Sequence, residues 1–199
     1  MSLAWLKQIQ KQLELLAIAW EVPLGVAVGW IQAESGGRLG EVTRLDERGY
    51  FQLLPEESKD LGIDHQRLST DAIYSLAQGF RLVDYYSHQV DRFAYAAGLR
   101  VEKGSEYHWR LAKLAHSIGQ GACKQMIIQA ARLRLEGWTA FATYFLAHDA
   151  EYTAKFKHSP VKWIGLVDRV FEIGRPYGLG STPKPGVATI SDVKLKRLA

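Results

Sequence analysis

The sequence predicts an all-α protein that contains at most a small β hairpin. Apolar residues recur every three or four positions through most of the 199 residues, the periodicity of helices that bury one face. No segment alternates apolar and polar residues as a half-buried strand does, and the chain has no internal repeat. Because 47% of the residues are hydrophobic and no linker interrupts them, we expect one domain over residues 1–180.

Two amphipathic helices are predicted before residue 35. The apolar positions of the first are Leu6, Ile9, Leu13, Leu16 and Trp20. The second is expected to begin at Pro23, because proline suits the first turn of a helix. Its inward face comprises Leu24, Ala27, Val28 and Ile31. Glu34 follows at the edge of that apolar face, where a lone carboxylate needs a partner or a proton.

The rest of the chain is predicted to be helical after one irregular segment. Glycines and charges break the pattern over residues 35–54, which indicates a loop or a small irregular β excursion. A short helix should follow over 55–62, and then a long core helix that is capped by Ser69 or Thr70. Further helical patterns cover about 105–118, 121–135, 138–148 and 160–173.

Charge and composition exclude several classes of function. The net charge is +4, but residues 181–199 carry four basic residues against one acidic residue, so the basicity belongs mostly to this tail. Without a clustered basic face or a nucleic-acid-binding motif, we expect no nucleic-acid partner. The six histidines form no compact ligand pattern, so we predict no metal and no cofactor. The tail is expected to be flexible and could tether a protein partner.

The N-terminus and the single cysteine bear on where the protein is made. No window approaches the roughly 18 apolar residues of a membrane span. The first 20 residues have the pattern of a helix rather than of a signal peptide, so we expect synthesis in the cytoplasm without a signal peptide. Cys123 has no partner for an internal disulfide and is expected to be a buried, inert thiol.

Three short segments carry the candidate chemistry: "ES" at 34–35, "GYFQLLP" at 49–55 and "AHSIGQGAC" at 115–123. Together they resemble motifs of the lytic transglycosylase and goose-type lysozyme superfamily, which has an ES dipeptide, a GLMQ-like segment and an AYNAGPGAV-like segment in this order. Gln52 follows Glu34 by 18 residues, a spacing like that of the family. The likeness extends over about residues 20–175.

The resemblance implies a lysozyme-like helical domain with a glycan-binding cleft, acting on the MurNAc-GlcNAc β-1,4 bond of peptidoglycan. It assigns the catalytic role to Glu34, because a carboxyl kept protonated by an apolar wall can protonate a glycosidic oxygen. The residues that it implies for substrate binding are Ser35, Gly49, Tyr50, Phe51, Gln52, His116 and Ser117. Within this set, Gln52 is expected to bind sugar or to orient Glu34.

The sequence departs from the family pattern at four positions. Tyr50 and Phe51 replace a leucine and a methionine, and His116 and Ser117 replace a tyrosine and an asparagine. His116 is either a partly buried structural histidine or a substitute for the phenol that hydrogen-bonds the catalytic glutamate or the substrate. If it were protonated, it would favour the ionised carboxylate, which works against a general acid.

Three functions stay open from the sequence. A lytic transglycosylase uses one glutamate as acid and then as base, so that the muramic C6 hydroxyl closes on C1 and a 1,6-anhydro sugar forms. A hydrolytic muramidase needs a second carboxylate, for which Asp46 and Glu47 are the candidates. A non-catalytic glycan-binding or structural module could share the fold. The expected absence of a signal peptide favours a bacteriophage lysin or a part of a secretion machine that acts at the cell wall.

Overall fold

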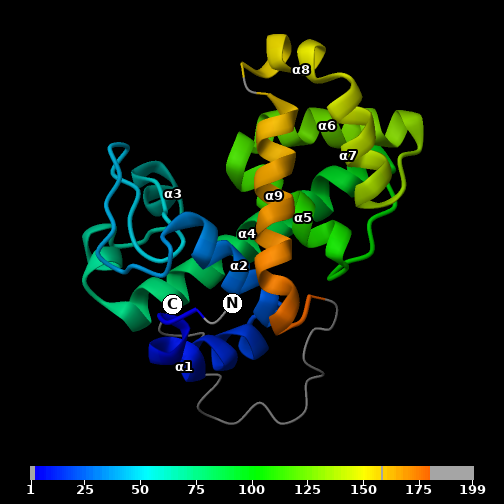
Figure 1. The fold of residues 1–199 in the computed structure, drawn as a ribbon. Helices are drawn as coiled ribbons and strands as arrows, with labels where there is room; N and C mark the ends of the chain where they lie inside the picture. The colour runs from blue at the N-terminus through cyan, green and yellow to red at the C-terminus, as the bar shows by residue number, and fades with distance from the viewer. Residues whose placement is uncertain (1–2, 158, 180–199) are drawn as a thin grey trace. The chain divides into compact units, whose positions relative to one another are not determined.

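The computed structural model describes residues 3–157 and 159–179, and these are mostly helical with almost no strand, which confirms the all-α class (Figure 1). The predicted tail over 181–199 lies outside the described residues. By its contacts the chain divides into two compact units. The first unit contains the chain up to Asp84 and again from Glu172, and the second unit is Tyr85–Phe171.

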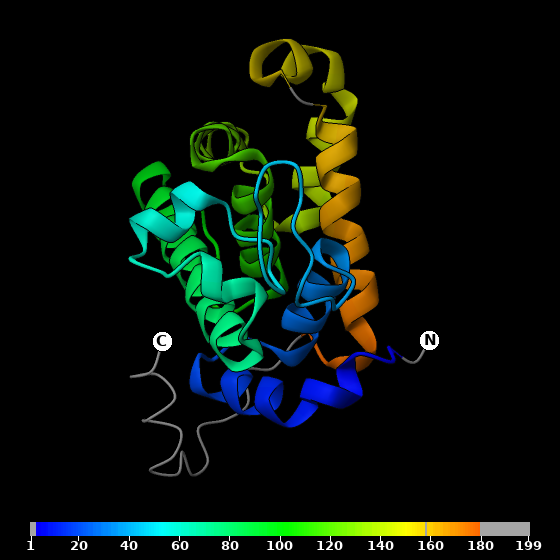
Figure 2. The ribbon, with the colours of Figure 1, turned by 90° about the vertical axis from the view of Figure 1, so that its left-hand side faces the viewer.

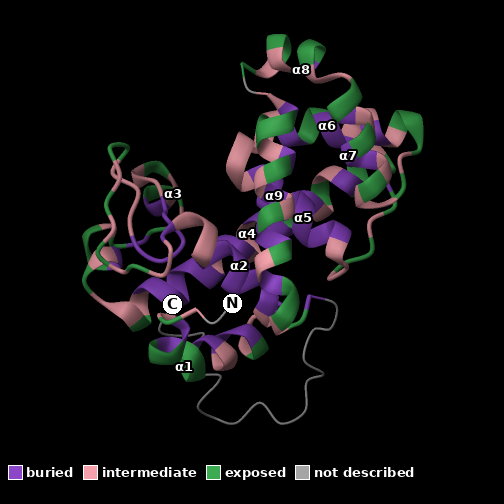
Figure 3. Ribbon diagram, in the orientation of Figure 1, coloured by how far each residue is buried: buried purple, intermediate pink, exposed green. Residues whose placement is uncertain are grey.

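The first unit is built around the helices α1 (Leu6–Ala19) and α2 (Leu24–Glu34), which contact each other. α1 buries one stripe of side chains, as its periodicity predicts, whereas α2 is buried at every position from Gly25 to Ile31 (Figure 3). A Cβ on Gly25 would lie 2.4 Å from the carbonyl oxygen of Gly174. It would also lie 2.6 Å from the carbonyl oxygen of Gly178. Because both of these oxygens belong to the backbone and cannot rotate away, this close approach requires glycine.

The segment between α2 and α3 (Pro55–Asp60) is a long loop (Figure 2). Its β character is limited to isolated bridges that pair Arg48 with Val42 and with Leu53. Arg48 and Leu53 exchange two backbone hydrogen bonds of 3.0 Å and thereby close a four-residue turn. The Glu57 carboxylate accepts the Leu54 N–H at 2.8 Å at the start of α3, an arrangement that the acidic first turn favours.

The long helix α4 spans Ala72–Ala97 and follows a single 3₁₀ turn, η1 (Gln66–Ser69). The predicted cap at Ser69 or Thr70 is wrong, because the Asp71 carboxylate accepts the Tyr74 N–H at 3.0 Å and so caps the first turn. The Ser69 hydroxyl instead donates to the Gln66 carbonyl within the 3₁₀ turn. The 3₁₀ turn therefore moves the start of the helix beyond both predicted caps.

The second unit contains α5 (Glu106–Ile118), α6 (Gln120–Leu133), α7 (Gly137–Ala147), α8 (Asp149–Phe156) and most of α9 (Pro160–Gly174). A second 3₁₀ turn, η2 (Arg175–Tyr177), follows α9 in the first unit. The sequence did not predict α8. Cys123 on α6 is fully buried, which confirms the prediction, and burial raises the pKa of its thiol to about 12.

Candidate active site

Glu34 is the last residue of α2 and is partly exposed, and the residue after it is completely buried. The Ser35 Oγ lies 2.9 Å from the Tyr50 carbonyl oxygen and 3.2 Å from the Ile31 carbonyl oxygen, and it accepts the Gly37 N–H at 3.2 Å. The serine of the ES pair therefore joins the end of the helix that carries the glutamate to the second motif.

The second motif forms the turn that Arg48 and Leu53 close. Gly49 has a φ of +77°, and a Cβ there would lie 2.4 Å from the Ser75 Oγ. The same hydroxyl accepts the Tyr50 N–H at 3.0 Å. Since Ser75 belongs to the first turn of α4, the turn is fixed both to that helix and, through Ser35, to α2. Only glycine fits the first position of this turn.

Phe51 has no exposed surface and packs between Trp30 and Phe80, at ring-centroid distances of 6.4 and 5.9 Å. A Cβ on Gly79 would lie 1.9 Å from the Phe51 ring, so α4 has a glycine where the ring lies against it. Phe51 thus contributes to the site by anchoring the turn in the core. Burial also raises the pKa of the neighbouring Tyr50 hydroxyl, whose residue is 6% exposed.

Gln52 completes the turn with a φ of +51°, and its side chain is buried. The Nε2 atom donates to the carbonyl oxygens of Gly49 at 2.8 Å and Glu41 at 3.2 Å. The Oε1 atom is buried and has no hydrogen-bond partner among the described residues. An unsatisfied buried acceptor costs about 1–3 kcal/mol.

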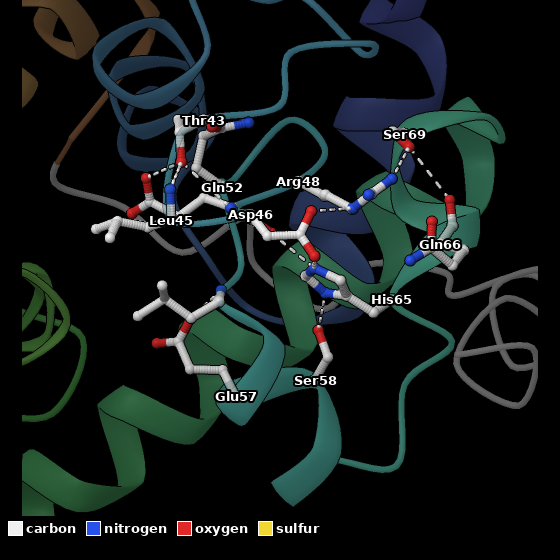
Figure 4. Close-up of polar contacts among 12 residues, drawn as sticks. Thr43, Leu45, Asp46, Arg48, Gln52, Glu57, Ser58, His65, Gln66 and Ser69 are labelled. Carbon is white, nitrogen blue, oxygen red and sulfur yellow. Dashed lines mark hydrogen bonds and ion pairs between the residues drawn. The ribbon is translucent and has the colours of Figure 1, made fainter.

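Both candidate second carboxylates bind groups of their own loop. Asp46 accepts the Arg48 Nε–H at 2.7 Å, in a pair where the arginine side chain is 18% exposed and the aspartate side chain 44% (Figure 4). Glu47 accepts the Thr43 hydroxyl at 2.7 Å. These contacts make the two carboxylates part of the loop's internal hydrogen bonding.

His65 connects the same loop to α3, a contact that sequence reasoning missed (Figure 4). Its Nε2 lies 2.7 Å from the Asp46 carbonyl oxygen, an acceptor only, so Nε2 donates, and its Nδ1 lies 2.8 Å from the Ser58 hydroxyl oxygen. Ser58 is 1% exposed. A buried hydroxyl that is hydrogen-bonded to this histidine braces the fold and is not accessible as a nucleophile.

The third-motif residues lie at the end of α5 in the second unit. The Nζ of Lys113, one turn earlier, lies 3.1 Å from the His116 Nδ1 and 2.9 Å from the Ser117 Oγ. The Tyr86 ring contacts the His116 ring edge-on, at a centroid distance of 5.4 Å. Lys113 was not among the predicted site residues, although its helical spacing of three and four from His116 and Ser117 indicates the contact.

Removing the Ser35 hydroxyl should loosen the link between the first two motifs. In Ser35→Ala the Tyr50 carbonyl and the Gly37 N–H lose a buried partner, so we expect the free energy of unfolding to fall by about 1–3 kcal/mol. Urea unfolding of the variant and the wild type measures the change. Thr70→Ala removes an exposed hydroxyl that donates to the Arg67 carbonyl, and a similar loss in that control would contradict the assigned role of Ser35.

The described residues contain no group of three or more histidine, cysteine, aspartate or glutamate side chains that could hold a metal ion. Within the same part of the chain, no helix combines the length and the apolar character that a membrane crossing requires. No family model matches the chain, and no curated protein or solved structure matches it either. The chemistry of the residues is therefore the basis for a functional proposal.

Proposed function

We propose that this protein is a lytic transglycosylase that cleaves the MurNAc-GlcNAc β-1,4 bond of peptidoglycan, with Glu34 as its catalytic residue and with a lysozyme-like glycan-binding cleft. The observation that carries the proposal is the hydrogen bond from the buried Ser35 hydroxyl to the Tyr50 carbonyl. It joins the glutamate-bearing end of α2 to the GYFQ turn, the two motifs on which the family resemblance depends most. Peptidoglycan is a cell-wall polymer, so the proposed place of action is the cell wall.

The proposed reaction needs one carboxyl group. The Glu34 carboxyl protonates the glycosidic oxygen while the bond from that oxygen to C1 of the muramic sugar breaks. The resulting carboxylate then removes the proton from the C6 hydroxyl, whose oxygen bonds to C1 and forms the 1,6-anhydro ring. The glutamate ends the cycle protonated, and no water is consumed.

The surroundings of Asp46 and Glu47 favour the transglycosylase over the hydrolase. A hydrolase needs a second carboxylate that can activate water or attack C1. Asp46 is engaged with Arg48, and Glu47 with Thr43, at 2.7 Å in both cases. Either role would require the carboxylate to exchange a contact that holds its own loop. A single-glutamate mechanism requires neither of these two carboxylates.

Mass spectrometry of the soluble products from purified peptidoglycan tests the proposal. We expect muropeptides that end in 1,6-anhydromuramic acid. In Asp46→Asn and Glu47→Gln the products should be the same and the rate should fall by less than about tenfold, well short of the loss on the order of 10²- to 10⁴-fold that is expected when a catalytic acid or base is removed.

Two other outcomes would redirect the assignment. Hydrated reducing ends, together with a rate loss on the order of 10² or more in one of these variants, would identify a hydrolase and its second carboxylate. If folded wild-type protein binds peptidoglycan and releases no product, the chain is a glycan-binding module instead.

A further inference from the structure

Lys113 is a fully buried lysine on α5, which is a costly place for an ammonium group unless it is hydrogen-bonded. Its Nζ bonds to two side chains one turn further along the helix, the His116 imidazole at 3.1 Å and the Ser117 hydroxyl at 2.9 Å. Both partners are residues that the resemblance implies for substrate binding. The lysine therefore contacts two candidate site residues from beneath the surface.

The chemistry of an ammonium group fixes the direction of both hydrogen bonds. It has three N–H donors and no acceptor, so the His116 Nδ1 must accept, and the imidazole is neutral with its hydrogen on Nε2. The Ser117 oxygen accepts in the same way, so the hydroxyl hydrogen is directed to a different acceptor. Protonating His116 would put a second positive charge beside the ammonium, which disfavours the imidazolium form.

The ring plane of His116 is also held from a second helix. The Tyr86 ring on α4 meets it edge-on at 88°, and Tyr86 is itself 5% exposed. The imidazole therefore contacts the Lys113 ammonium on its own helix and the Tyr86 ring on α4.

We propose that Lys113 is a positioning residue that keeps His116 neutral and protonated on Nε2, and keeps the Ser117 hydroxyl as a donor. Both side chains then select acceptor oxygens, such as an acetamido carbonyl, a carboxylate or a sugar oxygen. The inference that His116 and Ser117 contact peptidoglycan rests on the proposed function. The inference about the tautomer of His116 does not rest on it.

Nitrogen-15 NMR of histidine-labelled protein tests the proposal without any assay of activity. His116→Asn assigns the ring signals by their disappearance. In the wild type at about pH 7, His116 should show a protonated Nε2 and an unprotonated Nδ1. An imidazolium or an Nδ1–H tautomer would overturn the proposal, and this measurement depends on no variant that lacks the lysine.

Lys113→Met provides the second arm, with Lys124→Met as the control for losing a charge in the same unit. Lys124 is exposed on α6, with its ammonium 5.8 Å from the Phe93 ring centroid. At about pH 6, below the ordinary histidine pKa of about 6.5, His116 should gain imidazolium character in Lys113→Met. It should not do so in the wild type or in Lys124→Met. No gain in a folded variant would contradict the role of Lys113.

Turnover separates this inference from the proposed function. Lys113→Met should lower the rate of peptidoglycan cleavage by about 10- to 100-fold through misplaced donors, and Lys124→Met should not. Wild-type protein that has the Nε2–H tautomer and no activity refutes the enzyme and leaves the lysine's role standing. Active wild-type protein with the Nδ1–H tautomer would support the enzyme and refute the proposed role of Lys113.

Discussion

Glu34→Gln should reduce peptidoglycan turnover by on the order of 10²- to 10⁴-fold, the loss typical of removing a general acid. Glutamine keeps the size and the hydrogen-bonding ability of the side chain at the end of α2, but it cannot give a proton to the glycosidic oxygen or take one from the C6 hydroxyl. The rate at which soluble muropeptides appear measures the effect. Binding of the variant to insoluble peptidoglycan should stay close to that of the wild type.

Glu41→Gln is the matched control for this substitution. Glu41 lies in the loop after α2, where its carboxylate pairs with Arg38 at 2.9 Å in a largely solvent-exposed contact. Such a pair contributes about 0–1 kcal/mol, so the control should retain nearly full activity and stability. If Glu34→Gln makes the same products at a rate within about tenfold of the control, another group is the acid.

Phe51→Ala should lower the free energy of unfolding by about 3–5 kcal/mol, the largest loss of stability expected from the second motif. The ring has no exposed surface and lies between Trp30 and Phe80, against the glycine at position 79 of α4. Removing it opens a cavity that none of these neighbours can fill without moving a helix. Urea unfolding followed by tryptophan fluorescence measures the change, since Trp30 reports on this core.

Leu45→Ala is the control within the same loop, because Leu45 is 63% exposed. It should change stability by no more than about 0.5 kcal/mol. A loss in Phe51→Ala as small as that of the control would show that the loop contributes little to the folded core. In that case Phe51 could not anchor the turn as we describe.

Helical periodicity predicted most of the fold because burial of one helix face is what produces that pattern. The elements that the sequence missed are short and polar. α8 buries only Tyr152 among its eight residues, so its sequence lacks the repeated apolar positions that predict a helix. The start of α4 was misplaced because serine, threonine and aspartate are all good caps, and only the 3₁₀ turn at 66–69 decides among them.

The residues of the candidate site stay a prediction, and their contacts could not be predicted from the sequence. The family resemblance grouped the ES and GYFQ segments, and the structure brings Ser35 of the first against Tyr50 of the second. The bond from Ser35 to the Tyr50 carbonyl depends on a turn with positive φ at Gly49 and Gln52, and glutamine at such a position gives no sequence signal. The burial of Phe51 likewise depends on tertiary packing between the turn and α4.

Cys123 gives the second unit a built-in chemical reporter. It is the sole cysteine of the sequence, it is fully buried, and its thiol donates to the Leu111 carbonyl at 3.7 Å. The thiolate is the reactive form, so a thiol reagent can modify the native protein only when α6 separates from α5. The labelling rate of unmodified protein therefore measures how often this helix pair opens, and it does so without introducing a probe.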